Sequence, residues 1–190
     1  TAAPRLRPGA VKVRILAAFL PPYFGHLPSG GWMTPPRPFT PGQCAIGVVE
    51  ELGEGVEGFA PGQRVYCDMY VQGPGPVADQ GFIGCFAIHP EGQRHLATWP
   101  DGTFADYFVG LEHCLTVIPD AVQTAPEVLC RLGWFATALE GFRRGGFRPG
   151  MTVAIHGASG LLGASAALVA CAIGAGEVWL IGRRADHLAE

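Results

Sequence analysis

The chain has 190 residues, of which 48% are hydrophobic and 15% are charged, and its formal net charge is −3. This length allows one large domain or two small ones, and the many Gly and Pro residues are typical of a soluble globular chain rich in turns. The weak negative charge argues against nucleic acid or an anionic membrane surface as a partner.

The six cysteines lie far apart and include no Cys-x-x-Cys pair, so they form neither a zinc-lobe pattern nor a disulfide framework. We therefore expect reduced and mostly packed thiols in a cytoplasmic protein. The basic residues near the N-terminus are not followed by an apolar core, so the sequence predicts no signal peptide.

The first part of the chain has the pattern of strands separated by long loops. Alternating apolar residues predict strands at about 11–16, 45–52, 63–67, 101–109 and 114–118. The run 21–42 is predicted to be a loop with isolated aromatic residues, and the run 72–102 is irregular and rich in Gly and Pro. Loops of such length are usually functional or mobile. This part is therefore predicted to be an all-β barrel or sandwich.

A helix is predicted after these strands. Thr124 and Glu127 have the spacing of a capping box, with Thr124 as the N-cap. The helix is expected to run to about Arg144 and to end at the following glycine pair. The chain is therefore expected to divide into two domains, 1–123 and 124–190.

The stretch from Val153 to Gly163 combines a short strand, a turn with glycines spaced three apart, and a helix start. The helix is predicted from Leu161 to about Ile173, and a second strand from Glu177 to Ile181. These elements in this order form the dinucleotide-binding fingerprint, in the variant with Ala158 at the first glycine position. The helix N-terminus favours a phosphate. We expect the coenzyme to contact Gly157, Ala158, Ser159, Gly160, Leu161, Leu162 and Gly163.

Two other interpretations compete for this stretch. Residues 153–176 carry no Lys, Arg, Asp or Glu, which raises the question of a membrane span. Five glycines and His156 interrupt the run, and it divides into a strand and a helix, so we expect no span. The second alternative is an ordinary strand–turn–helix that binds no ligand.

The second predicted strand is followed by Gly182, Arg183 and Arg184. An NAD-preferring site carries Asp or Glu about 20 residues beyond the glycines, where it binds the ribose 2′-hydroxyl. A glycine there leaves room for a 2′-phosphate, and guanidinium groups bind phosphate with paired hydrogen bonds. We therefore predict NADP(H) as the cofactor, with a solvated arginine pair as the alternative.

Four motifs together resemble those of the medium-chain dehydrogenase/reductase superfamily, which includes zinc alcohol dehydrogenases and quinone oxidoreductases. They are Pro-Gly-Gln-Arg-Val at 61–65, Asp-Gly-Thr-Phe-Ala-Asp-Tyr at 101–107, Arg-Pro-Gly-Met-Thr-Val at 148–153 and His-Gly-Ala-Ser-Gly-Leu-Leu-Gly at 156–163. The resemblance implies an α/β plus β fold, in which a GroES-like partly open β-barrel precedes the first βαβ unit of a Rossmann domain, with the nicotinamide between the domains. Members are normally nearly twice this long, so the chain looks truncated.

Zinc members hold the catalytic metal with a Cys, the His of a Gly-His-Glu motif, and a later Cys or Asp. The matching positions here are Pro21, Gln43 and Gly133, none of which is a normal zinc donor. The four-cysteine structural lobe is also absent, since residues 68–100 contain only Cys85. The resemblance therefore implies a zinc-free member. A rearranged metal site is the alternative, with ligands from His26, Cys44, Cys67 and Cys130.

Without zinc, an isolated ketone is a poor hydride acceptor, whereas a quinone or an α,β-unsaturated carbonyl spreads the incoming charge itself. A few hydrogen-bond donors then stabilise the enolate-like oxygen. Thr137 aligns with a family threonine beside the nicotinamide, or bonds back to its own helix. Tyr23 and His26 match the loop that borders the substrate in relatives. They are expected either to donate a proton there or to have no chemical role, as loop residues that are packed or exposed. Gln43 is a candidate hydrogen-bonding group at the metal position.

The sequence thus predicts an NADP(H)-dependent oxidoreductase acting on a small-molecule quinone or enone. An alcohol dehydrogenase with rearranged zinc ligands and a dinucleotide-binding module without turnover stay open as alternatives. Relatives often form homodimers through edge strands of the Rossmann sheet, which this chain lacks.

Overall fold

The structure, a computed structural model, describes residues 4–29, 32–75, 78–184 and 186–188. The chain forms two compact units that divide between Arg131 and Leu132. Within the described residues, no helix combines the length and the apolar character that crossing a membrane requires.

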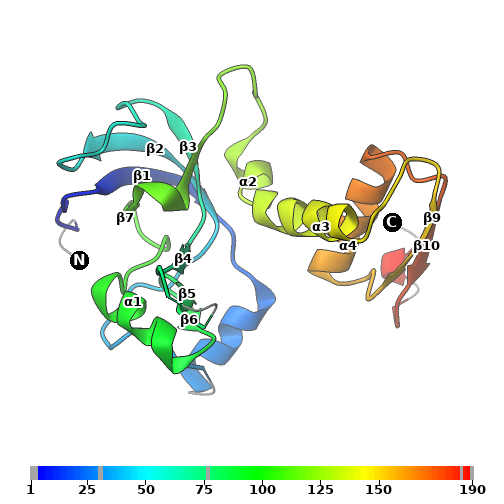
Figure 1. The fold of residues 1–190 in the computed structure, drawn as a ribbon, viewed down its shortest axis with the longest axis horizontal. Coiled ribbons are helices and arrows are strands. Elements are labelled where there is room, and N and C mark those ends of the chain that lie inside the picture. Colours follow the sequence, from blue (N-terminus) through cyan, green and yellow to red (C-terminus); the bar gives the residue numbers. More distant parts are fainter. Residues whose placement is uncertain (1–3, 30–31, 76–77, 185, 189–190) are drawn as a thin grey trace. The chain divides into compact units, whose positions relative to one another are not determined.

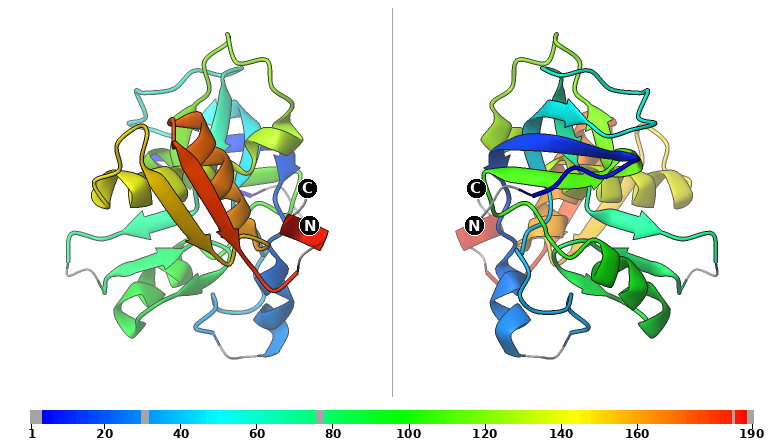
Figure 2. Two further views of the ribbon diagram at one scale, coloured as in Figure 1. Left: turned by 90° about the vertical axis from the view of Figure 1, so that its right-hand side faces the viewer. Right: turned by 90° about the vertical axis from the view of Figure 1, so that its left-hand side faces the viewer.

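The first unit is built on a five-stranded antiparallel sheet with the strand order β7-β1-β2-β3-β8 (Figure 1). The strands are β1 (Ala10–Ala18), β2 (Ala45–Leu52), β3 (Arg64–Cys67), β7 (Tyr107–Leu111) and β8 (Leu115–Val117). The register between β1 and β2 shifts at two points, and such bulges increase the local bend and twist of a strand pair. The sheet is therefore curled (Figure 2).

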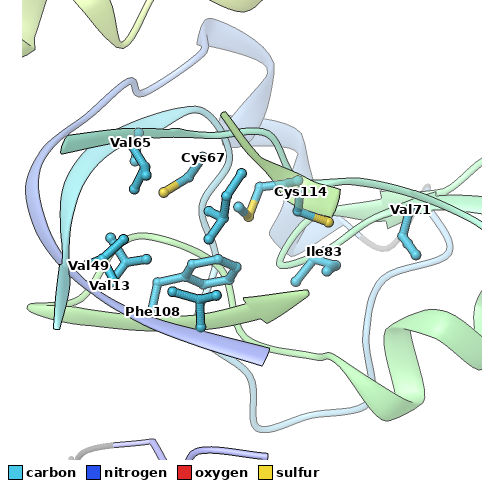
Figure 3. Packing of buried hydrophobic residues seen from close by; sticks show 12 residues of the cluster. Val13, Val49, Val65, Cys67, Val71, Ile83, Phe108 and Cys114 are labelled. Atoms are coloured by element: carbon cyan, nitrogen blue, oxygen red, sulfur yellow. The ribbon is translucent and has the colours of Figure 1, made fainter. Parts of the chain in front are cut away.

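The core of this unit lies inside the curl of the sheet. Val11 and Val13 of β1 are fully buried, as the predicted alternation requires. Figure 3 shows Phe108 of β7 close to Val13 and Val49, on the inner side of the sheet. Phe108 is 1% exposed, and burying a phenylalanine side chain contributes about 1.5–3 kcal/mol. The predicted strand at 101–109 is wrong over 101–106, because β7 begins only at Tyr107.

The two long loops predicted from the sequence contain short elements. The run 21–42 holds a 3-10 helix, η1 (Pro22–Ser29), which follows β1. The prediction that the run 72–102 is an irregular loop is wrong, because this region folds into a lobe of short strands and helices. This lobe comprises β4 (Tyr70–Gln72), β5 (Gln80–Phe82), β6 (Phe86–Ala87), η2 (Pro90–Gly92) and α1 (Gln93–Thr98). Strands of two or three residues are too short to show an alternating pattern.

The single helix predicted over 124–144 is wrong, because two helices occupy this region, α2 (Pro126–Leu129) and α3 (Leu132–Arg144). The N-cap of α2 is Ala125, without a side-chain cap, so Thr124 does not form the predicted capping box. Pro126 accounts for this shift, since proline is favoured at the first helical position and fixes the cap at the residue before it.

The second unit contains α3 and two parallel strands joined by a helix. These elements are β9 (Thr152–His156), α4 (Leu161–Ala172) and β10 (Glu177–Ile181), close to the predicted bounds. β9 pairs with β10 from Thr152↔Glu177 to His156↔Ile181. Ile155 and Ala170 are buried between the strands and α4. A short 3-10 helix, η4 (Asp186–Leu188), follows β10.

In the first unit, a further 3-10 helix, η3 (Glu112–Cys114), links β7 to β8.

Candidate functional site

The glycine turn between β9 and α4 is tied to the end of β10. Gly157 has a φ of +75°, a conformation that residues with a side chain rarely adopt. Its N–H donates to the carbonyl of Ile181 at 2.8 Å, and the N–H of Ala158 donates to the same oxygen at 3.1 Å. The turn is therefore held at the carboxyl end of both parallel strands, which is where ligands bind in open α/β sheets.

The third glycine of the turn allows a close approach of backbone to backbone. A Cβ on Gly163 would overlap the carbonyl oxygen of Gly157 and lie 2.8 Å from the Cα of Ala158. A Cβ on Gly157, in contrast, would meet no atom within 4 Å. The inner side of the turn is thus tightly packed and its outer side is open.

The N-terminus of α4 presents backbone donors. Gly160 is the N-cap, has an extended conformation and provides no side-chain cap. The first helical hydrogen bond that reaches this N-cap runs from Ala164 N–H to Gly160 O at 2.8 Å. Within the described part of the chain, no backbone carbonyl accepts from the amides of Leu161, Leu162 or Gly163. Such orphan donors, together with the helix dipole, favour an anion.

The strand end that carries the arginine pair lies beside the turn. A Cβ on Gly182 would be 3.1 Å from Ser159 Oγ, so this position packs closely against the turn. Arg183 and Arg184 are both exposed. Arg184 forms an ion pair with Asp186 at 3.1 Å, whereas Arg183 has no ion-pair partner among the residues that the structure describes. Arg183 is therefore the more available cation.

In the first unit, the structure brings Tyr23 and Gln43 together. The hydroxyl of Tyr23 donates a hydrogen bond to Oε1 of Gln43. The side chain of Gln43 is 6% exposed, and its backbone carbonyl accepts from Thr103 Oγ1 at 2.6 Å. Burial raises the pKa of Tyr23, and nearby Cys85 and Cys44 raise it further. Tyr23 therefore stays a neutral phenol across the physiological range.

Three glycines from separate segments meet beside Gln43, and one of them, Gly42, directly precedes it. The N–H of Gly42 donates to Gly84 O at 3.1 Å, and a Cβ on Gly42 would be 2.7 Å from Thr103 Oγ1. A Cβ on Gly84 would be 2.6 Å from Gly102 N, and one on Gly102 would be 2.8 Å from Gly42 N. Only glycine fits at these approaches, so three separate segments meet backbone to backbone beside Gln43.

Aromatic rings surround Tyr23. Its ring centroid lies 5.7 Å from those of Phe24 and Trp32, and Trp32 lies 4.6 Å from Phe86. Such tilted pairs add about 0.5–1.5 kcal/mol beyond the area that they bury. Cys85 packs in the same cluster, and burial raises its pKa to about 12. The cluster anchors η1 to the lobe.

Two other predicted residues lie apart from this pair. His26 is on η1 but is exposed. Thr137 is in α3 of the second unit, is exposed, and donates from its hydroxyl to Gly133 O at 2.8 Å. This is the back-bonded geometry named above as the alternative for Thr137. The oxygen of Thr137 keeps its capacity to accept a hydrogen bond.

The donor set does not fit a catalytic zinc. Within the described residues, no three His, Cys, Asp or Glu side chains gather so that they could hold a metal ion. Cys67 is buried in the core of the curled sheet, while Cys44 and Cys130 belong to a second cluster, packed with Ile46 and Leu129. At Gln43, the amide oxygen that would face a metal already accepts from Tyr23.

Sequence reasoning missed Thr103, Trp32 and Cys85 as neighbours of the Tyr23–Gln43 pair. Thr103 lies in the motif at 101–107, which marked the segment without indicating its partner. Gln43 and Thr103 are 60 residues apart, and no local pattern reports a contact over that separation.

The chain is similar to known dehydrogenases. The alcohol dehydrogenase GroES-like domain matches residues 7–120. An alcohol dehydrogenase from Geobacillus stearothermophilus is 28% identical over 171 residues, which cover 83% of this chain and 46% of the relative. A quinone oxidoreductase from Rattus norvegicus is 23% identical over 165 residues, which cover 86% of this chain and 41% of the relative.

A solved structure extends the likeness to both units. It is that of a candidate zinc-binding dehydrogenase from Sinorhizobium meliloti 1021 bound to NADP. The two chains are 25% identical, with a TM-score of 0.82 over 98% of this chain and 53% of the other. The present chain thus spans about half the length of the relatives that it matches.

Proposed function

The chain belongs to the medium-chain dehydrogenase/reductase superfamily, and we propose that it forms part of an NADPH-dependent oxidoreductase. The reaction proposed is reduction of a quinone or an α,β-unsaturated carbonyl by hydride transfer, without zinc. The observation that carries the proposal is the Tyr23–Gln43 hydrogen bond, at the position where zinc members have a histidine ligand. A glutamine amide so engaged is a hydrogen-bonding group and not a metal donor.

The glycine turn supports the coenzyme part of the proposal. The second unit would act as the first βαβ unit of a Rossmann domain, with the coenzyme phosphates on the amides of Leu161, Leu162 and Gly163. The open outer side of Gly157 lets a ligand approach the backbone. Bound NADPH supplies the hydride. The relative from Sinorhizobium meliloti, which is bound to NADP, favours the same coenzyme class.

The remaining work belongs to the chain's own side chains. Arg183 would hold the 2′-phosphate, and the oxygen of Thr137 would accept a hydrogen bond from the coenzyme. In the first unit, hydrogen-bond donors at the Tyr23–Gln43 pair would hold the substrate's carbonyl oxygen as it gains negative charge. Because a conjugated acceptor delocalises that charge, neutral donors suffice.

Coenzyme preference provides the test. In the protein at its natural length, Arg183→Ala should weaken NADPH binding by about tenfold or more, since a hydrogen bond between charged groups contributes about 1.5–3 kcal/mol, and should leave NADH binding unchanged. Arg184→Ala should have a smaller effect because Asp186 already neutralises that guanidinium. Arg148→Ala removes an exposed charge before the start of β9, at the opposite end of the strand from the turn, and serves as the control. An unchanged ratio of the two affinities in Arg183→Ala would contradict the assignment.

A further inference from the structure

This inference rests on the proposed function and assigns the group that contacts the substrate. We infer that the side-chain amide N–H of Gln43 donates the hydrogen bond to the substrate's carbonyl oxygen, and that Tyr23 and Thr103 are positioning residues. The substrate class is a planar conjugated carbonyl with an apolar ring. Its β-carbon accepts the hydride, NADPH becomes NADP⁺, and the resulting enolate oxygen is held by Gln43 until water supplies a proton to the α-carbon.

The hydrogen-bond direction within the pair carries the first step. A phenol has one hydrogen to donate, and that of Tyr23 is given to Gln43 Oε1. With Oε1 occupied, the donors that Gln43 still offers are the two hydrogens on Nε2. Within the described residues, no acceptor takes a hydrogen bond from this nitrogen. Gln43 is only 6% exposed and its two side-chain donors have no partner among these residues, so they are available to a ligand.

The raised pKa of Tyr23 argues against this phenol as the proton donor to the substrate, and only its hydrogen bond with Gln43 acts to lower that pKa. Burial raises the pKa of its phenol, and the electrostatic effect of Cys85 and Cys44 acts in the same sense. A phenol with a raised pKa is a weaker proton donor at neutral pH than an ordinary tyrosine. The hydrogen bond from Tyr23 to Gln43 Oε1, together with this raised pKa, gives Tyr23 an orienting role.

The surroundings fix Gln43 before a substrate arrives. Thr103 is 1% exposed and donates to the Gln43 carbonyl at 2.6 Å. The glycine approaches at Gly42, Gly84 and Gly102 leave the backbone little freedom. A donor fixed in advance stabilises developing charge without the cost of reorganising during the reaction.

The substrate class follows from the aromatic rings that neighbour Gln43 through Tyr23. Tyr23, Trp32 and Phe86 are each partly exposed and form a row of neighbouring rings, of which Tyr23 contacts the amide of Gln43. Aromatic side chains bind flat conjugated rings through stacked or tilted contacts. Near Gln43 they favour a carbonyl that belongs to such a ring over an extended aliphatic ketone.

The test compares pH profiles of enone reduction in the protein at its natural length. Gln43→Glu keeps the acceptor for Tyr23 but presents a carboxylate to the substrate oxygen at neutral pH. Its kcat/KM at pH 7 should fall roughly 100-fold, the scale of losing one oxyanion donor, and should rise as acid restores an O–H donor. The wild type should show no such rise. Gln43→Met, which has no donor, should be slow at every pH and covers the case in which Gln43→Glu does not fold.

Tyr23→Phe should lose only about tenfold, because the amide survives without its orienting bond. Gln123→Glu is the matched control, since Gln123 is exposed and bonds only locally to Asp120 O at 2.5 Å. NADPH binding, measured by fluorescence, should be unchanged in all variants. A Gln43→Glu profile like that of the wild type, or a greater loss in Tyr23→Phe than in Gln43→Met, would overturn the inference while the proposed function stands. Absence of NADPH binding in the wild type would instead contradict the proposed function.

Discussion

At the scale of single residues, the glycines of the turn have distinct tasks. Gly157 needs its positive φ, whereas Gly163 needs the absence of a Cβ. The three-residue spacing predicted the turn because these demands are local and recur wherever a strand enters a helix over a phosphate. The Tyr23–Gln43 bond had no such signal, since its partners are 20 residues apart and meet only through the packing of η1.

Gly163→Ala tests the close approach. The added Cβ would overlap the carbonyl oxygen of Gly157, so the turn must open, and overpacking of this kind costs about 1–3 kcal/mol. We expect a lower free energy of unfolding and weaker NADPH binding, measured by denaturant titration and by coenzyme fluorescence.

The control for this substitution is Gly141→Ala in α3, where an added Cβ meets no atom within 4 Å. Because alanine is the better helix former, this variant should be more stable by about 0.5–1 kcal/mol. Equal stability changes in the two variants would show that Gly163 has no packing role.

At the scale of elements, the lobe β4–β6 with α1 is organised around one buried carboxylate. Asp79 is 3% exposed, accepts from Arg94 Nε at 3.0 Å, and contacts His95 Nε2 at 2.8 Å. Arg94 and His95 are both on α1, so Asp79 ties the helix to the hairpin. The hydrogen bond from Arg94 is the main cause of the lowered pKa of Asp79; burial opposes it and His95 adds to it.

Asp79→Asn should lower the midpoint of thermal unfolding by several degrees. The folded-state pKa of Asp79 lies below its ordinary value of 3.8, so its stabilising effect is fully present above that value and is lost as the pH falls through the folded pKa. The difference between wild type and variant should therefore be constant near neutral pH and shrink below pH 3.8.

Glu140→Gln is the control for this variant, because Glu140 makes only exposed ion pairs with Arg143 and Arg144. It should leave the unfolding midpoint unchanged. If Asp79→Asn behaved like Glu140→Gln, the lobe would not depend on the buried carboxylate.

The elements were predictable to unequal degrees. The longer strand β2 and the parallel pair with α4 follow clear apolar periodicities, and their bounds agree closely with the sequence pattern. The lobe escaped prediction because its strands are short and Asp79 meets its partners only after folding. The break between α2 and α3 was hidden because neither of the two residues that lie in it, Cys130 and Arg131, is a glycine or a proline.

At the scale of the whole molecule, the two units hold separate sets of candidate site residues. The first unit holds the Tyr23–Gln43 pair, and the second holds the glycine turn and the arginine pair. The family resemblance seen in the sequence is confirmed by the match to the alcohol dehydrogenase GroES-like domain and by the structural relatives. Coenzyme preference, substrate class and the roles of individual residues stay predictions.

Hydride transfer from NADPH without a metal can be tested by the rate of enone-dependent NADPH oxidation, measured before and after exhaustive chelation. Metal content should be measured on the same samples of the protein at its natural length. We expect an unchanged rate at a metal content far below one ion per chain. Loss of turnover on chelation, with recovery when Zn²⁺ is returned, would contradict it.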